Sequence, residues 1–184
     1  MNCDISRGRL EECAESVGGI NAVYFVNHDA LGVATYDVTD TDVITEFGNA
    51  PDISAYKFDV RGASTYTETP TKSRENGTTF FEQVLELQLP KLTKEDHKTV
   101  KLLAYGSPHI LIEDNNGNVF VAGLEYGLDV SGGSIVTGGA MGDMSGYTLS
   151  FTGQEKVPAN FIVDGGASVL ESIEDTGLTV VVGL

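Results

Sequence analysis

Short apolar runs that suit β-strands recur along the chain, separated by polar or glycine-rich segments. Residues 20–26 (INAVYFV) are β-branched, aromatic and nearly all apolar, which predicts a strand covered on both faces. Residues 32–38 and 43–47 flank an acidic turn at 39–42 and predict a hairpin. From Tyr56 apolar and polar positions alternate, which is typical of a half-exposed strand.

A polar segment, residues 62–79 (GASTYTETPTKSRENGTT), interrupts this pattern. It has almost no large aliphatic residue and contains Pro70, so we expect a long loop outside the core. Residues 80–89 (FFEQVLELQL) return to period two and predict an amphipathic strand with Glu82 and Glu86 on its polar face.

One helix is predicted at about residues 93–105. Thr93 supplies an N-cap, acidic residues follow in the first turn, and lysines lie toward the other end, which suits the helix macrodipole. Residues 109–113 and 118–124 flank a turn of Asp, Asn and Gly at 114–117, and this composition predicts a hairpin.

The next segments predict the end of a β-rich domain that spans residues 20–163. Residues 127–146 hold seven glycines and predict a flexible stretch. Residues 146–154 (GYTLSFTGQ) alternate again and predict a half-buried strand.

Both ends of the chain differ from this domain. Residues 1–19 are polar and predict an arm, or a short helix over Leu10–Val17. Residues 164–184 form a C-terminal extension with a predicted helix at 168–173 and an apolar end, LTVVVGL. An unpaired apolar strand would be adhesive, so we expect this end to dock on the domain or on a neighbouring molecule.

Composition supports one mainly β domain. The chain has 184 residues, 41% of them hydrophobic and 21% charged, as in globular proteins. Its 22 glycines and many β-branched residues favour strands and tight turns over helices. The 11 basic and 27 acidic residues give a net charge of −16, which disfavours nucleic-acid binding but would let a polyanion slide past a surface without adhering.

Two cysteines and the absence of an apolar leader indicate the expected compartment. Cys3 and Cys13 are too few for a disulfide framework and lack metal-site spacing, so free thiols are favoured over a disulfide. The first twenty residues are charged throughout, and no segment has the roughly 20 apolar residues that span a bilayer. We expect synthesis in a reducing cytoplasm and no membrane partner.

Catalytic chemistry is not predicted. The three histidines, His28, His97 and His109, lie in no recognisable nucleophile or metal motif. Glu82 and Glu86 could in principle act as an acid and base pair, but a charged outer or channel face is the better interpretation. We therefore expect no enzyme activity.

Two acidic turns resemble parts of calcium-binding loops. They are Asp37, Asp40 and Asp42, and the turn at residues 114–117, but neither has the downstream glutamate that completes such a loop. We expect solvated turns, no metal and no cofactor.

Two stretches carry a resemblance to a known family. Residues 142–156 (GDMSGYTLSFTGQEK), followed by Pro158 and Ala159, resemble the closing strand region of bacteriophage tail tube proteins, where glycine-tyrosine-x-leucine-x-phenylalanine-x-glycine-x-glutamate recurs ahead of a proline. Residues 3–9 (CDISRGR) also resemble the start of short virion proteins of tailed phages. Together these stretches cover under a quarter of the chain.

The resemblance implies a fold and a function. The fold is a β-sandwich closing toward a barrel, with one flanking helix. The function is that of a structural virion protein in the tail, a subunit that forms hexameric rings stacked into a tube and contacts other tail proteins. Genome DNA passes through the lumen during ejection without specific binding.

Candidate residues follow from this expectation. The polar segment 62–79 would reach the next subunit or ring, and its candidate subunit contacts are Thr65, Tyr66, Thr67, Arg74 and Asn76. Sheet edges would pair around the ring. Glu82 and Glu86 are the candidate lumen-facing residues, because their strand places both on one face.

Other functions stay open from sequence. They are a capsid decoration or tail completion protein, the tube of a contractile injection system, and a carbohydrate or small-ligand binding β domain. A ligand-binding domain should stay monomeric with a defined pocket, whereas a tube subunit should form rings or tubes at high concentration.

Overall fold

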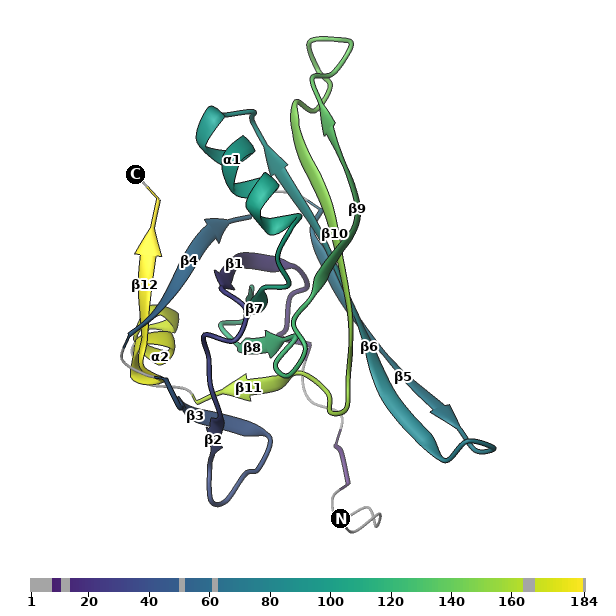
Figure 1. The fold of residues 1–184 in the computed structure, drawn as a ribbon, viewed down its shortest axis with the longest axis vertical. Helices are drawn as coiled ribbons and strands as arrows, with labels where there is room; N and C mark the ends of the chain where they lie inside the picture. Colours follow the sequence, from purple (N-terminus) through teal and green to yellow (C-terminus); the bar gives the residue numbers. More distant parts are fainter. Residues whose placement is uncertain (1–7, 11–13, 50–51, 61–62, 164–167, 184) are drawn as a thin grey trace.

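The computed structural model describes residues 8–10, 14–49, 52–60, 63–163 and 168–183 (Figure 1). Sheet A has eight strands in the order β12-β4-β1-β7-β8-β11-β3-β2, and sheet B has four in the order β5-β6-β10-β9. The strands of sheet A are β1 (Ile20–Val26), β2 (Ala34–Tyr36), β3 (Val43–Phe47), β4 (Ile53–Asp59), β7 (His109–Asp114), β8 (Val119–Ala122), β11 (Asn160–Ile162) and β12 (Leu178–Val182). Those of sheet B are β5 (Thr65–Ser73), β6 (Thr78–Pro90), β9 (Asp129–Val136) and β10 (Gly146–Glu155). The predicted class, a mainly β sandwich or barrel with a flanking helix, is confirmed.

Strand β1 lies inside sheet A and is buried on both faces, as its apolar sequence predicted. Tyr24 and Val26 point into a core lined by the strands of sheet A and by α2 (Val169–Asp175). Val23 and Phe25, on the opposite face, belong to a second core. Because successive side chains of a strand alternate, one strand serves both cores.

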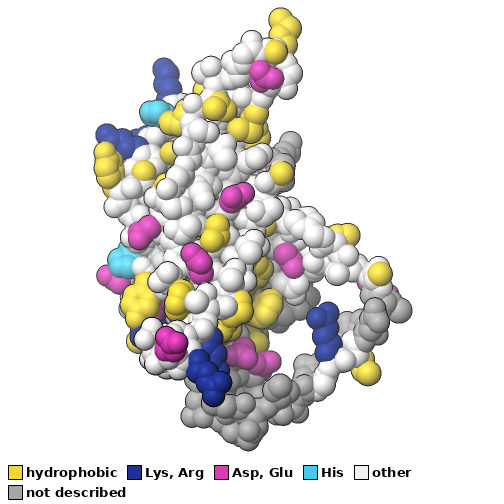
Figure 2. Space-filling model, turned by 90° about the vertical axis from the view of Figure 1, so that its right-hand side faces the viewer, with side chains coloured by type: hydrophobic (Ala, Val, Ile, Leu, Met, Phe, Trp, Pro, Cys, Tyr) yellow, Lys and Arg dark blue, Asp and Glu magenta, His cyan; other side chains and the backbone are white. Residues whose placement is uncertain are grey.

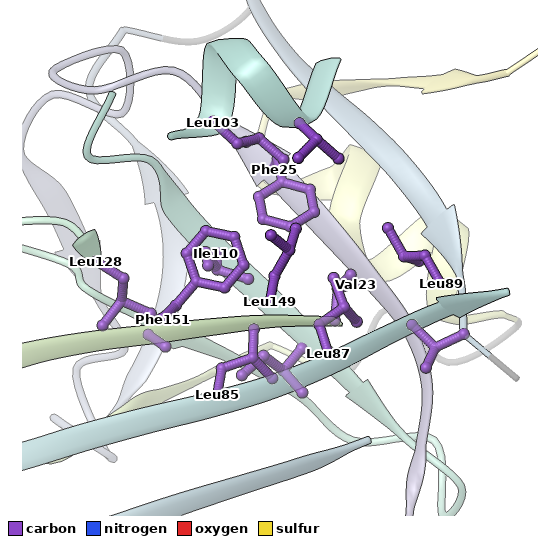
Figure 3. Packing of buried hydrophobic residues seen from close by; sticks show 14 of the residues in the cluster. Val23, Phe25, Leu85, Leu87, Leu89, Leu103, Ile110, Leu128, Leu149 and Phe151 are labelled. Atoms are coloured by element: carbon purple, nitrogen blue, oxygen red, sulfur yellow. The ribbon is translucent and has the colours of Figure 1, made fainter. Parts of the chain in front are cut away.

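The second core lies between sheet A and sheet B. β6 contributes alternate leucines, and β10 contributes Leu149 and Phe151, which face Phe25 and Ile110 of sheet A (Figure 3). The rings of Phe25 and Phe151 have centroids 5.6 Å apart. Burial of these large side chains holds sheet B against sheet A.

Helix α1 (Lys94–Leu103) covers one end of this second core, and it confirms the helix predicted from sequence. Thr93 is its N-cap, and the hydroxyl oxygen accepts a hydrogen bond from the Asp96 N–H at 3.0 Å. Val100 and Leu103 are the buried residues of the helix. The three lysines of the helix, Lys94, Lys98 and Lys101, are exposed.

The predicted hairpin of β7 and β8 is confirmed. Asp114 Oδ1 accepts hydrogen bonds from the N–H groups of Asn116 and Asn118, at 2.9 and 2.8 Å. The Asn116 side chain also bonds both backbone groups of Val17, at 2.9 and 2.8 Å. This turn therefore fixes the point from which the N-terminal segment leaves the domain.

The C-terminal segment docks on its own chain over the described residues 168–183. α2 confirms the helix predicted at residues 168–173. β12 pairs in parallel with β4, and both Ile173 and Leu178 are buried in the core of sheet A. The apolar run of the C-terminus is thus paired on one side.

The prediction of a long loop at residues 62–79 is wrong for residues 65–73 and 78–79. These residues belong to β5 and β6, which pair from Thr65 opposite Glu86 to Ser73 opposite Thr78. The segment does extend beyond the core. It forms a strand without large aliphatic side chains because β-branched threonines occupy alternate positions in it.

Two further predictions need correction or lie outside the described residues. Part of the expected flexible stretch at residues 127–146 is β9, which pairs with β10. The helix alternative at Leu10–Val17 is wrong for residues 14–17, which are not helical, while residues 11–13 are outside the described part. Cys3 and Cys13, and the resemblance at residues 3–7, are also outside it.

Candidate assembly surface

Sheet B has one face in the core and one face in solvent. The inner face carries the leucines of β6 and Tyr147, Leu149 and Phe151 of β10. The strand registers place the intervening residues on the opposite side, which we call the outer face. On β5, β6 and β10 these are Thr65, Thr67, Thr69, Thr71, Ser73, Thr78, Phe80, Glu82, Val84, Glu86, Gln88, Thr148, Ser150, Thr152 and Gln154. Hydroxyl groups dominate this face.

The two candidate lumen residues lie on the outer face. Both Glu82 and Glu86 are exposed; Glu82 lies opposite Thr69 and Gln154, and Glu86 lies opposite Thr65 and Ser150. Four positions along a strand separate their Cα atoms by roughly 13 Å. None of the outer-face residues of the four strands is Lys or Arg. Figure 2, which faces this side, shows mainly uncharged side chains with scattered acidic ones, and Lys or Arg side chains toward the lower part and the upper left of the view.

The two edge strands of sheet B are β5 and β9. Each pairs with one strand only, so one row of its backbone N–H and C=O groups has no partner in sheet B. β9 is mostly exposed along its length, and Gly132 and Gly133 leave the middle of the strand without side chains. Since all pairs in sheet B are antiparallel, β5 and β9 run in opposite directions. A second copy could therefore continue the sheet in antiparallel order.

The hairpin tips extend past the core. Arg74 and Asn76 lie in the turn that joins β5 and β6. At the other hairpin, Asp143 Oδ2 accepts hydrogen bonds from the N–H groups of Gly139 and Ala140, at 2.9 and 2.8 Å. These two bonds hold the pKa of Asp143 below its usual value. The tip of the β9–β10 hairpin is therefore a closed turn, with Met141 fully exposed on it.

The structure separates the candidate contact residues into three groups. Thr65 and Thr67 share the outer face with the two glutamates, whereas Arg74 and Asn76 lie at the hairpin tip. Tyr66 is on the inner side, half-buried, and its ring lies 5.2 Å from that of Phe120. Tyr66 thus does not belong to the same face as its two neighbours in sequence.

A polar network behind sheet B was not anticipated from sequence. The N–H of Gly123 donates to Gln83 Oε1 at 2.8 Å, and Gln83 Nε2 donates to Glu68 Oε1 at 3.4 Å. Glu68 Oε1 also accepts from the Ala159 N–H at 3.1 Å. Gln83 and Glu68 occupy inner-face positions of β6 and β5, and they tie the two strands to loops of the domain.

Glu155, at the end of β10, is a buried carboxyl group. Its Oε1 accepts hydrogen bonds from the N–H groups of Glu125 and Tyr126, at 3.0 and 2.9 Å. Its Oε2 is buried and has no hydrogen-bond partner among the described residues. Burial raises the pKa of Glu155 above its ordinary value, although the two N–H groups oppose the shift.

We expect Glu155→Gln to be more stable than the wild-type protein at pH 7. A raised folded-state pKa means that this carboxyl contributes fully to stability below its unfolded-state pKa, and that the contribution is lost as pH rises through the folded-state pKa. Glutamine stays neutral and keeps an oxygen for the same two N–H groups. Urea unfolding at several pH values should show a stability difference that shrinks toward pH 4.

The exposed Glu75→Gln is the matched control, and it should change the free energy of unfolding by under about 0.5 kcal/mol. A Glu155→Gln protein less stable than wild type at pH 7 would show instead that the charged carboxylate is favourable in its site.

The histidines of the described chain take part in structural contacts. His109 Nε2 accepts the Asp29 N–H at 3.1 Å, so the other ring nitrogen donates to the Gly123 carbonyl oxygen at 2.5 Å. Burial lowers the pKa of His109, which favours the neutral ring. The ring of His28 stacks on it at 5.4 Å. Both nitrogens of His109 are thus engaged with the backbone.

The acidic turn at residues 37–42 is closed by its own hydrogen bonds. Asp37 Oδ1 accepts from the N–H groups of Thr39 and Asp40, at 2.6 and 3.1 Å, as expected for a solvated turn. In the described part of the chain no three His, Cys, Asp or Glu side chains gather as metal ligands. No helix of the described residues has the length and apolar character to cross a membrane.

Comparisons with known proteins do not assign the chain to a family. No protein-family model matches the chain, and neither the search of curated proteins nor the search of solved structures found a match.

Proposed function

We propose that the protein is the tube subunit of a bacteriophage tail, and that it forms closed rings which stack into a hollow tube. The observation that carries the proposal is sheet B, which combines a polar, lysine-free outer face with two unpaired, oppositely directed edges. Such a sheet can continue from copy to copy, and closure removes its edges.

Ring closure would join β9 of one copy to β5 of the next. Four antiparallel strands per copy keep the alternation of strand direction across each junction. A six-membered ring, which the resemblance to tail tube proteins implies, would then be one continuous barrel. Sheet A and α1 would lie outside it and support sheet B through the second core.

The outer face of sheet B would line the lumen. Threonine and serine hydroxyls are neutral, and Glu82 and Glu86 repel phosphates. A duplex inside such a channel meets no Lys or Arg from the outer face of these strands, so counterion release does not favour its binding. DNA could therefore pass without adhering, which is the property that ejection requires.

The family resemblance falls on the same sheet. Residues 146–155 are β10, a central strand of sheet B, and Tyr147, Leu149 and Phe151 within it are buried. These apolar positions hold the strand on the core, while Thr148 and Ser150 face outward. The residues that suggested a tail tube protein thus support the sheet on which the proposal rests.

Replacing Glu82 and Glu86 by Lys should leave the fold intact and make the assembled tubes retain DNA. Both side chains are exposed, so the change costs little in the subunit. Each copy would add two lysines to the lumen, and duplex retention at about 50 mM salt should rise at least about tenfold and fall steeply with added salt. Sedimentation of tubes with labelled duplex measures this.

The matched control is Glu171→Lys with Glu174→Lys on α2, where both side chains are exposed and sheet B is not involved. Equal retention by the two pairs of substitutions would remove the lumen assignment. In the phage that encodes the protein, the Glu82 and Glu86 substitutions should hinder DNA ejection, and unchanged infectivity would argue against the proposal.

A further inference from the structure

Basic residues are unevenly distributed over the chain. No Lys or Arg occurs in residues 10–56, whereas Lys91, Lys94, Lys98 and Lys101 fall in or just before α1. All four are exposed. With Glu95 and Asp96 in the same stretch, the local charge is 4 − 2 = +2 on a chain of formal charge −16.

The same helix leads into an exposed apolar surface. Leu102 is 61% exposed and Tyr105, just after the helix, is 81% exposed. These side chains and the lysines form what we call the α1 surface, which consists of Lys94, Lys98, Lys101, Leu102 and Tyr105. Large apolar side chains beside basic ones are typical of a contact with a partner of opposite charge.

The β2–β3 hairpin carries the opposite charge. Its turn contains Asp37, Asp40 and Asp42, and Val38 between them is fully exposed. The hydrogen bonds from the N–H groups of Thr39 and Asp40 to the Asp37 carboxylate keep the turn in one conformation. The hairpin therefore presents a preformed acidic tip with an apolar side chain at its centre.

These two surfaces lie far apart along the longest axis of the molecule. Figure 1 shows α1 in the upper part and the β2–β3 hairpin at the lower end. Because the two elements lie apart in one molecule, the two surfaces cannot meet each other within it. We propose that the α1 surface of one copy binds the β2–β3 tip of a second copy, so that successive rings stack head to tail.

This inference rests on the proposed function and adds the surface and the partner. A contact between two different patches is heterologous, and without rotational closure it repeats without end, as a tube requires. The lysines of one copy would meet the aspartates of the next, which offsets part of the repulsion between chains of charge −16. Leu102 and Tyr105 would be covered together with Val38.

Charge exchange tests the contact. Lys98→Glu with Lys101→Glu places acidic groups against the acidic tip, and Thr41→Lys with Asp42→Lys places basic groups against the α1 surface. The second pair leaves the hydrogen bonds to Asp37 in place. Each pair alone should raise the concentration at which half of the rings are stacked by at least about tenfold. A chain with all four substitutions has two acidic and two basic side chains at the tip, so the repulsion introduced by the Lys98 and Lys101 pair is removed. It should regain part of the stacking that the Lys98 and Lys101 pair loses.

Electron microscopy of ring stacks, at matched concentrations, gives the readout, and thermal unfolding shows that each variant is folded. If the wild-type protein forms tubes and the Lys98 and Lys101 variant stacks equally well, this inference is wrong but the proposed function still stands. Failure of the fourfold variant to regain stacking would also overturn it. If the wild-type protein forms no rings, the proposed function fails as well.

Discussion

The Phe151→Ala protein is expected to lose about 3–5 kcal/mol of unfolding free energy, because it leaves a large cavity between the two sheets. Phe151 is fully buried and lies against Phe25 of sheet A. A loss of that size is a large share of the roughly 5–15 kcal/mol that stabilises a typical domain. Urea unfolding of the monomer at low concentration measures it.

Thr152→Ala is the matched control, since its side chain is the next along β10 and lies on the outer face. It should change the free energy of unfolding by under about 0.5 kcal/mol in the monomer. Similar losses for the two substitutions would mean that the outer face is as buried as the inner one, and the alternation that defines the two faces would be wrong.

Cysteines placed on the two edges of sheet B are expected to link copies into covalent rings. The chain would carry Thr67→Cys on β5 and Ser134→Cys on β9, with Cys3 and Cys13 replaced by Ser. Paired antiparallel strands bring opposite Cα atoms to about 4.5–5.5 Å, which a disulfide can bridge. Mild oxidation of the assembled protein should convert most monomer into a ladder that ends at one closed size.

Each single-cysteine chain is the control, and it should give at most a dimer, because it offers one thiol per copy. The relative register of β5 and β9 sets which residues are opposite, so Thr65→Cys and Thr69→Cys are tested with the same Ser134→Cys. If all three pairs give only monomers and dimers, copies do not join through these edges.

Local patterns in the sequence were enough for the elements whose stability comes from nearby residues. The N-cap at Thr93 and the Asp114 turn both depend on groups within four positions, and both were predicted. β1 was predicted because a strand that is buried on both faces must be apolar at nearly every position, as residues 20–26 are. The period-two pattern of β6 also predicts that Glu82 and Glu86 share one exposed face, as they do in the structure.

Elements held by distant residues were missed. β5 and β9 have few apolar side chains, and they are strands because β6 and β10 pair with them. Glycines at residues 132 and 133 suggested flexibility, yet the strand is fixed by its register with β10. The role of Glu155 depends on the N–H groups of Glu125 and Tyr126, about thirty positions away, which no local pattern reveals.

Electron microscopy of the purified wild-type protein at millimolar concentration tests the central claim most directly, because that claim is self-assembly through sheet B. We expect closed rings of one size, many of them stacked into hollow tubes. A uniform field of single, unassociated molecules at that concentration would contradict the account.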